Sequence, residues 1–151
     1  MSHTPYPFEQ IHPTRYRFFS LGRNQIEKIV DFTPLNLRNM VNLGFGDKMP
    51  DGSVDDRIAS NNGDIKKVLS TVIMIVNHFT TLHPQIIIYF SGSTHERTML
   101  YTRILTMYHA SFKNEFEIYG ISDAKTKGLR LPFDPCAQIS YLAFLIKRIN
   151  Y

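Results

Sequence analysis

Hydrophobic and polar positions alternate along the chain in blocks, and the period of each block indicates the element it forms. Period-two alternation over Arg15–Phe19 and Ile26–Phe32, with Gly22 and Asn24 between them, predicts a β-hairpin. A shorter block over Met40–Phe45 has its apolar residues on one side at the same period. We therefore expect a third strand after the hairpin.

Apolar residues recur at helical spacing between residues 65 and 79, which predicts an amphipathic helix. Asn61 or Asn62 is suited to cap it, Asp64 to occupy its first turn, and Pro84 to close it. The apolar positions are Ile65, Val68, Leu69, Val72, Ile73, Val76 and Phe79.

Gln85–Phe90 is a nearly unbroken apolar run, as expected for a central strand covered on both faces. A second helix is predicted to start at Ser93, with Glu96 completing a capping box. Its expected buried stripe consists of Leu100, Tyr101, Ile104, Leu105 and Tyr108.

The rest of the chain is less regular. Alternation over Glu115–Ile121 predicts a half-exposed strand. The apolar residues of Tyr141–Arg148 fit either the helical or the strand period, and we interpret the segment as a closing strand. Lys48–Asn62 and Asp123–Pro135 are predicted to be loops. Residues 1–13 are predicted to form an irregular arm because they contain Pro5, Pro7 and Pro13.

The predicted fold class is α+β, in the order β-β-(β)-α-β-α-β-β, with a mixed sheet and two main helices. We expect the central strand to lie parallel to a neighbour through a helical crossover. The order is compatible with a ribonuclease-H-like arrangement, a comparison of order alone. At 151 residues, we expect one domain over 1–151 with an aromatic core, since 11 Phe and 8 Tyr occur without Trp.

Composition narrows the function classes. Seventeen Lys and Arg against thirteen Asp and Glu give a net charge of +4, a mild excess that permits nucleic-acid or nucleotide binding without requiring it. Cys136 is the single cysteine, so no intrachain disulfide can form and a cytoplasmic location is expected. No secretion signal or membrane-spanning run occurs, which predicts a protein that does not insert into membranes.

The most informative local feature lies where the central strand passes into the second helix. Amides at a helix N-terminus, with hydroxyls and a glycine nearby, can bind an anion, and Arg97 one turn in can contact phosphate. The competing interpretation is that the hydroxyls only cap the helix and that Arg97 pairs with a surface acid. The residues expected to bind the ligand are Gly92, Ser93, Thr94, His95, Arg97 and, as an outer contact, Arg103.

Aspartates gather in and around the loop that precedes the first helix. Carboxylates brought together in space bind Mg²⁺, which nucleases use to activate water. The candidate metal ligands are Asp47, Asp55, Asp56 and Asp64. The competing interpretation is a solvated loop in which Asp64 acts only at the helix start.

Arg15, Tyr16, Arg17, Phe18 and Phe19 interleave basic and aromatic residues. Such a strand can hold single-stranded nucleic acid, but its alternation favours Tyr16 and Phe18 as core residues.

The chain resembles a family of small, functionally uncharacterised bacterial proteins found mainly in Bacteroidetes. The resemblance implies a cytoplasmic bacterial protein and carries no catalytic assignment. It rests on Asn42-Leu43-Gly44-Phe45-Gly46-Asp47, Asp55-Asp56, Asn61-Asn62-Gly63-Asp64, and Gly92-Ser93-Thr94 with Arg97-Thr98 and Leu100-Tyr101.

Three functional hypotheses follow. The leading one is a module that binds a phosphate-bearing ligand, nucleic acid or nucleotide, at the turn before the second helix. The first alternative is a Mg²⁺-dependent nuclease or phosphotransfer enzyme, of the kind found among toxins. The second is a protein-interaction module without a small ligand, acting with a protein partner or as a homo-oligomer.

Overall fold

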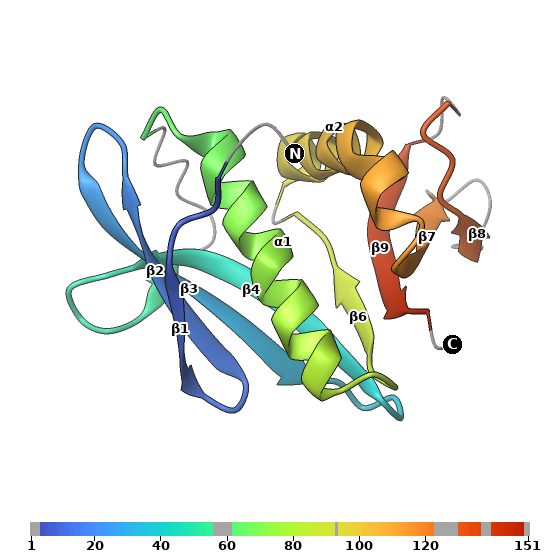
Figure 1. Ribbon diagram of the computed structural model, residues 1–151, viewed down its shortest axis with the longest axis horizontal. Coiled ribbons are helices and arrows are strands. Elements are labelled where there is room, and N and C mark those ends of the chain that lie inside the picture. Colours follow the sequence, from blue (N-terminus) through green and yellow to red (C-terminus); the bar gives the residue numbers. More distant parts are fainter. Residues whose placement is uncertain (1–3, 56–61, 93, 123–129, 137–139, 150–151) are drawn as a thin grey trace. The chain divides into compact units, whose positions relative to one another are not determined.

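The computed structural model describes residues 4–55, 62–92, 94–122, 130–136 and 140–149. Within these residues nine strands form a mixed sheet accompanied by two long helices (Figure 1), which confirms the predicted α+β class. The elements are β1 Phe8–His12, β2 Arg15–Leu21, β3 Gln25–Pro34, β4 Met40–Lys48, β5 Val54–Asp55, α1 Ile65–Leu82, β6 Ile87–Phe90, α2 His95–Phe112, β7 Phe116–Ser122, β8 Arg130–Pro132 and β9 Tyr141–Arg148.

Hydrogen-bonded neighbours in the sheet follow the order β1-β2-β3-β4-β6-β9-β7-β8, and β5 pairs with β4 off this path. β4 and β6 are parallel, and α1 lies between them in the sequence. This confirms the predicted helical crossover. The hairpin β2–β3 and the strands β6, β7 and β9 were also predicted at nearly these positions.

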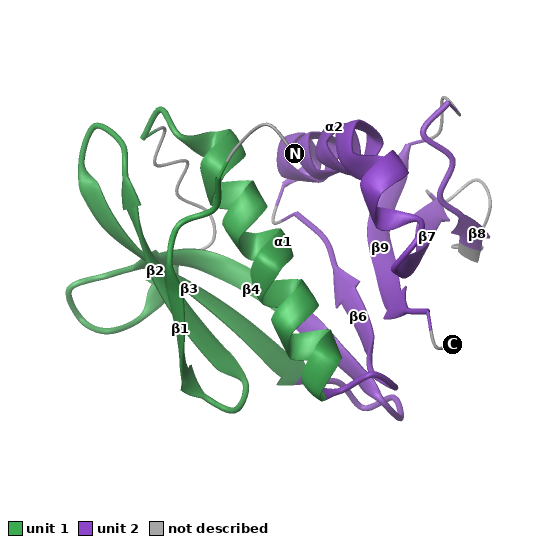
Figure 2. Cartoon of the chain, in the orientation of Figure 1, with its two compact units in different colours: residues 1–33, 43–82 green, residues 34–42, 83–151 purple. Residues whose placement is uncertain are grey.

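The chain divides into two compact units (Figure 2), which are described separately. Unit 1 comprises residues 1–33 and 43–82, and unit 2 comprises residues 34–42 and 83–151. Each unit therefore contains one long helix. The prediction of one domain over residues 1–151 stays a prediction.

In unit 1, α1 packs on one face of the β2–β3 hairpin. The rings of Phe32 and Phe79 are stacked, with centroids 3.9 Å apart and an interplanar angle of 3°. Tyr16 and Phe18 point to the same face and are buried. The aromatic core predicted from composition is confirmed here.

In unit 2, α2 packs on the face of the sheet to which Phe90 and Phe116 point. The rings of Phe90 and Tyr101 contact each other edge to face at 5.9 Å. Leu105 and Tyr108 of the predicted stripe are buried, whereas Tyr101 and the other two predicted positions are half-buried. The predicted residues therefore lie on α2 as expected, but only two of the five are buried.

Three short strands were missed. Phe8–His12, in the arm predicted to be irregular, forms β1 and pairs with β2, because no proline falls inside it. Val54–Asp55 forms β5 within the predicted loop, following a turn in which Gly52 has a φ of 87°. Arg130–Pro132 forms β8 and pairs with the outer edge of β7.

The predicted helix starts differ from the structure: the side chain of Asn62 binds the hairpin turn instead of capping α1, and Asn61 lies outside the described residues. The side chain of Thr94, not Ser93, caps α2 by accepting the Arg97 N–H, so Glu96 is not at the third position that a capping box requires. α1 begins after Asp64, and the backbone oxygen of Asp64 accepts the Val68 N–H. Helix ends depend on contacts that a sequence pattern does not show.

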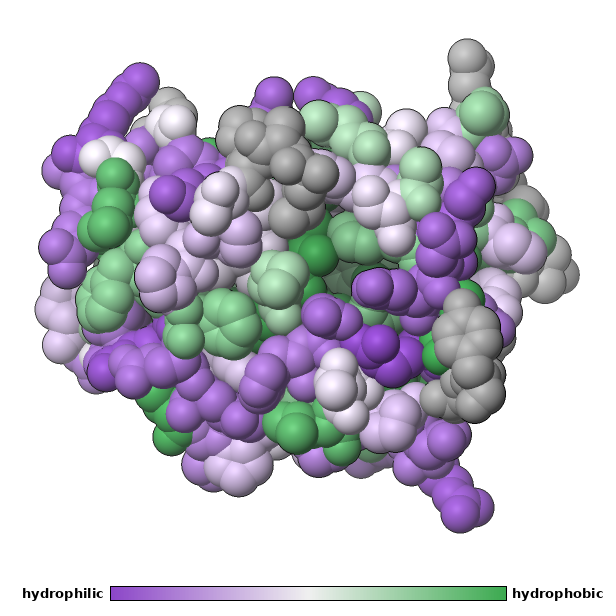
Figure 3. Space-filling model, in the orientation of Figure 1, coloured by the Kyte–Doolittle hydropathy of each residue, from purple (hydrophilic) through white to green (hydrophobic). Residues whose placement is uncertain are grey.

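Exposed apolar side chains are distributed over both units. The face drawn in Figure 3 shows hydrophobic residues interspersed with hydrophilic ones. Such scattered residues need no functional explanation. The most exposed are Leu37, Leu21, Met107, Leu82, Leu142 and Ile65.

Candidate functional site

The turn between β6 and α2 is closed by hydrogen bonds within the chain. The Gly92 N–H donates to Thr98 Oγ1 at 3.1 Å, and the Thr98 hydroxyl donates to the Thr94 carbonyl at 3.2 Å. The Arg97 N–H donates to Thr94 Oγ1 at 3.2 Å. Two of the amides that the sequence offered to an anion, those of Gly92 and Arg97, are therefore used by the turn itself.

Gly92 is required by the packing of this turn. A Cβ at this position would lie 2.4 Å from the Thr98 backbone nitrogen and 2.6 Å from Arg97 Cβ. These distances are too short for any side chain. We expected Gly92 to let a ligand come close to the backbone. In the structure, the first turn of α2 occupies that space.

The side chains at the start of α2 differ in exposure. Thr94, His95 and Arg103 are exposed, Arg97 is half-buried, and Ser93 lies outside the described residues. The exposed groups can still meet a phosphate. Their role in ligand binding stays a prediction.

Asp47 is committed to an ion pair inside unit 1. Its carboxylate accepts a hydrogen bond from the Lys28 ammonium, and both residues are buried. Asp55 lies opposite Asp47 in the β4–β5 pair, and Asp56 falls outside the described residues. In the part of the chain that the structure describes, no three His, Cys, Asp or Glu form a group that could hold a metal.

Asp64 accepts hydrogen bonds from two hydroxyls. Tyr6 Oη and Ser20 Oγ each donate to Asp64 Oδ2 at 2.5 Å. The Tyr6 oxygen in turn accepts the Leu21 N–H at 3.1 Å. Burial, together with the hydrogen bond to Asp64, raises the pKa of Tyr6. Asp64 therefore ties the residues before β1 to the hairpin and to the start of α1.

Asn62 fixes the hairpin turn. Its side chain accepts the Asn24 N–H at 2.7 Å and donates to the Asn24 carbonyl at 2.7 Å and to Ser20 Oγ at 2.9 Å. The Arg23 N–H donates to the Asn62 carbonyl at 2.9 Å. Asn62 was predicted only as a helix cap, so sequence reasoning missed this contact. Its position beside the predicted hairpin turn could not be read without the fold.

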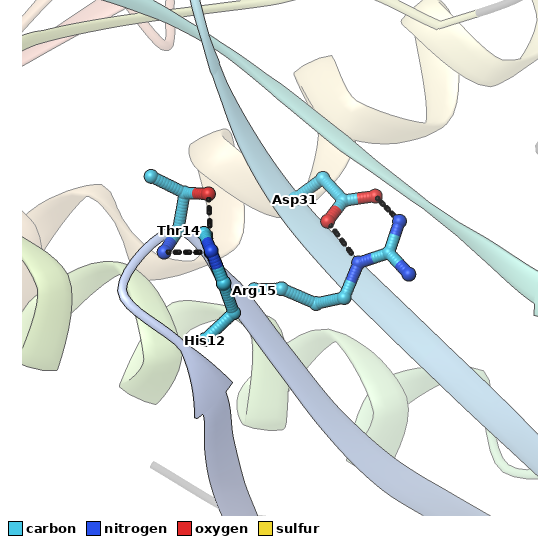
Figure 4. A network of polar contacts seen from close by, with 4 residues as sticks. All are labelled: His12, Thr14, Arg15 and Asp31. Atoms are coloured by element: carbon cyan, nitrogen blue, oxygen red, sulfur yellow. Dashed lines mark hydrogen bonds and ion pairs between the residues drawn. The ribbon is translucent and has the colours of Figure 1, made fainter.

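The strand with interleaved basic and aromatic residues is a structural element. Tyr16 and Phe18 are buried, which confirms the core interpretation. Arg15 makes a bidentate ion pair with Asp31, with Nε–Oδ1 and Nη2–Oδ2 distances of 2.7 and 3.0 Å (Figure 4). Arg17 pairs with Glu9 on β1.

The remaining candidate surface is the face of the unit 2 sheet opposite α2. Tyr89 and Tyr119 both pair with Leu145, one from each side, so the three side chains form one row across β6, β9 and β7. Both tyrosines are half-buried and Leu145 is buried. In the next row, Ile87 and Lys147 line a small depression together with Tyr119 and Leu145.

Sequence reasoning missed this surface, which we call the tyrosine face (Tyr89, Leu145, Tyr119, Ile87 and Lys147). Alternation in β7 placed Tyr119 on the half-exposed strand. The register that aligns Tyr119 with Tyr89 was not readable, because strand partners far apart in sequence are not encoded in local periodicity.

Comparisons with known proteins assign no activity. Among the described residues no helix is long and apolar enough to cross a membrane. No curated protein and no solved structure matches the chain. The model of a family of unknown function, DUF6934, matches residues 2–149, nearly the whole chain. The chain therefore belongs to this family of unknown function.

Proposed function

We propose that this protein binds nucleic acid through unit 2. The observation that carries the proposal is the distribution of charge. Unit 2 contains nine Lys and Arg against five Asp and Glu, whereas unit 1 contains eight of each. The net positive charge of the chain therefore resides in unit 2, and a basic surface attracts the phosphate backbone.

In unit 1, Lys28, Arg15 and Arg17 each contact a carboxylate. In unit 2, Arg103 on α2 is exposed. The phosphate contacts predicted at the start of α2 belong to the same basic unit. They agree with the proposal, which depends on the charge of unit 2 and not on these contacts.

The first test measures binding by fluorescence anisotropy with labelled single-stranded RNA, single-stranded DNA and duplex DNA. We expect binding at low ionic strength that weakens as salt rises, because phosphate contacts release counterions. Arg103→Gln should weaken binding, whereas Lys66→Gln on α1, an exposed residue of unit 1, should not. No binding of any probe at low salt contradicts the proposal.

The same probes address the nuclease alternative. Incubation with and without Mg²⁺, followed by gel analysis, shows whether the probe is cut. If the probes stay intact, the nuclease alternative is excluded and nucleic-acid binding remains the proposed function. Metal-dependent cleavage, abolished by Asp55→Asn, would instead favour the enzyme.

A further inference from the structure

We propose that the tyrosine face is the surface on which bases of single-stranded nucleic acid stack. The inference rests on the nucleic-acid binding proposed above and adds both the site and the form of the ligand. It depends on a contact surface, whereas the proposal above depends on charge, so the two can fail separately.

The helix of unit 2 lies on the other side of the sheet, and on the tyrosine face Tyr89 and Tyr119 are half-buried around the buried Leu145. Phe90 contacts Tyr101 of α2, and Phe116 contacts Phe112 of α2. Tyr89 is adjacent to Phe90 in β6, and neighbouring residues in a strand point to opposite faces. In the described part of unit 2, α2 is the one helix, and it contacts Phe90 and Phe116 on the other face.

Register places two aromatic rings where they can hold two bases. Tyr89 on β6 and Tyr119 on β7 are separated by the single strand β9, with Leu145 between them. Strands lie roughly 4.8 Å apart, so the two tyrosine backbones are about 10 Å apart. Aromatic residues that share one face of a sheet are suited to stacking on unpaired bases.

The groups around the row fit a nucleotide chain. Lys147 lies in the adjacent row, between Ile87 of β6 and Glu117 of β7, and provides an ammonium for a phosphate. The Tyr119 hydroxyl donates to Glu117 at 3.2 Å. We therefore expect the ring of Tyr119, and not its hydroxyl, to contact the ligand. The depression is small. A base therefore lies over the face instead of entering a pocket.

This arrangement selects single strands. In a duplex the base faces are already stacked on one another, whereas an unpaired base offers its face to an aromatic ring. Stacking is tolerant of sequence because every base has such a face. We expect RNA and DNA single strands to bind, and duplex DNA to bind more weakly.

The test uses the full chain and labelled single strands of about 12 nucleotides, within the span that comparable open surfaces cover. Tyr89→Leu and Tyr119→Leu remove the ring but keep an apolar side chain. Tyr89→Phe and Tyr119→Phe keep the ring and serve as matched variants. Phe19→Leu, at an exposed aromatic position on β2 of unit 1, is the control for loss of an aromatic residue elsewhere. Circular dichroism confirms that each variant is folded.

We expect each leucine variant to weaken binding by about fivefold or more, while the phenylalanine variants and Phe19→Leu bind like the wild type. If the leucine variants bind like the wild type, the tyrosine face is not the site, and nucleic-acid binding itself survives. If the wild type binds no probe, both proposals fail. If only duplex DNA binds, the stacking site is wrong.

Photo-crosslinking keeps the proposal testable if a leucine variant does not fold. RNA carrying 4-thiouridine is crosslinked to the wild type, and the attached peptides are identified by mass spectrometry. Crosslinks on β6, β7 or β9 support the tyrosine face. Crosslinks confined to other segments overturn it.

Discussion

The Lys28 ammonium and the Asp47 carboxylate form a buried ion pair between β3 and β4, with 7% and 9% of the two side chains exposed. Asp47→Ala would leave the ammonium in the interior without this carboxylate. We expect the free energy of unfolding to fall by about 3–5 kcal/mol. Urea denaturation followed by circular dichroism measures the change.

Replacing both partners is the control for this pair. Lys28→Met combined with Asp47→Leu removes both charges and keeps apolar volume, so it should cost much less than Asp47→Ala alone. If the double variant is as unstable as the single one, packing at these positions, and not the loss of the Asp47 carboxylate beside Lys28, explains the loss.

Gly22 and Asn62 provide a second prediction. A Cβ at Gly22 would lie 1.8 Å from the Asn62 carbonyl oxygen, so Gly22→Ala must separate the hairpin turn from the segment before α1. We expect a loss of about 2 kcal/mol or more, since the hydrogen bonds of Asn62 would be disrupted with it. Thermal unfolding measures the shift.

Gly52→Ala is the matched control, because Gly52 has a φ of 87° and no atom within 4 Å of the added Cβ. This variant should cost about 1 kcal/mol from backbone strain alone. Equal losses for the two variants would show that the contact with Asn62 contributes little.

Stability should fall at alkaline pH because of two tyrosines. Burial raises the pKa of both Tyr6 and Tyr16 above the ordinary value of 10.0, and the hydrogen bond to Asp64 adds to the effect at Tyr6. The neutral hydroxyl is thus favoured in the folded state. The resulting stability is fully present below the unfolded pKa and is lost as pH rises through the folded pKa.

Urea denaturation at pH values from about 8 to about 11 measures this dependence, which begins near the tyrosine pKa. Tyr6→Phe cannot ionise at this position, so its curve should fall less steeply above pH 10.0 than that of the wild type. Parallel curves for the two proteins would show that Tyr6 does not contribute.

Arg97 tests the hypothesis that a phosphate binds at the start of α2. If it does, adding inorganic phosphate or an oligonucleotide should raise the melting temperature of the wild type, and Arg97→Ala should abolish the increase. Arg38→Ala, at an exposed position of unit 2, is the control. An unchanged ligand response in Arg97→Ala would remove this residue from the site.

The motifs behind the family resemblance are accounted for largely by structure. Asn62 and Asp64 bind the hairpin, and Gly92 and Thr98 close the turn before α2. These contacts join segments that are close in space, and only some are close in sequence. The residue types were visible beforehand, but their partners were not, so Asp64 was interpreted as a candidate metal ligand and Gly92 as part of a ligand site.

The sequence alone determined the elements whose periodicity is strong, the β2–β3 hairpin and α1, because side-chain period reflects which residues face a core. It also determined that Tyr16 and Phe18 lie inside. The tertiary structure decided what these elements meet: Asp47 with Lys28, Asn62 with Asn24, and Tyr89 aligned with Tyr119 across Leu145. The reason is physical, since periodicity is local along the chain, whereas ion pairs, caps and strand register depend on neighbours that folding brings together.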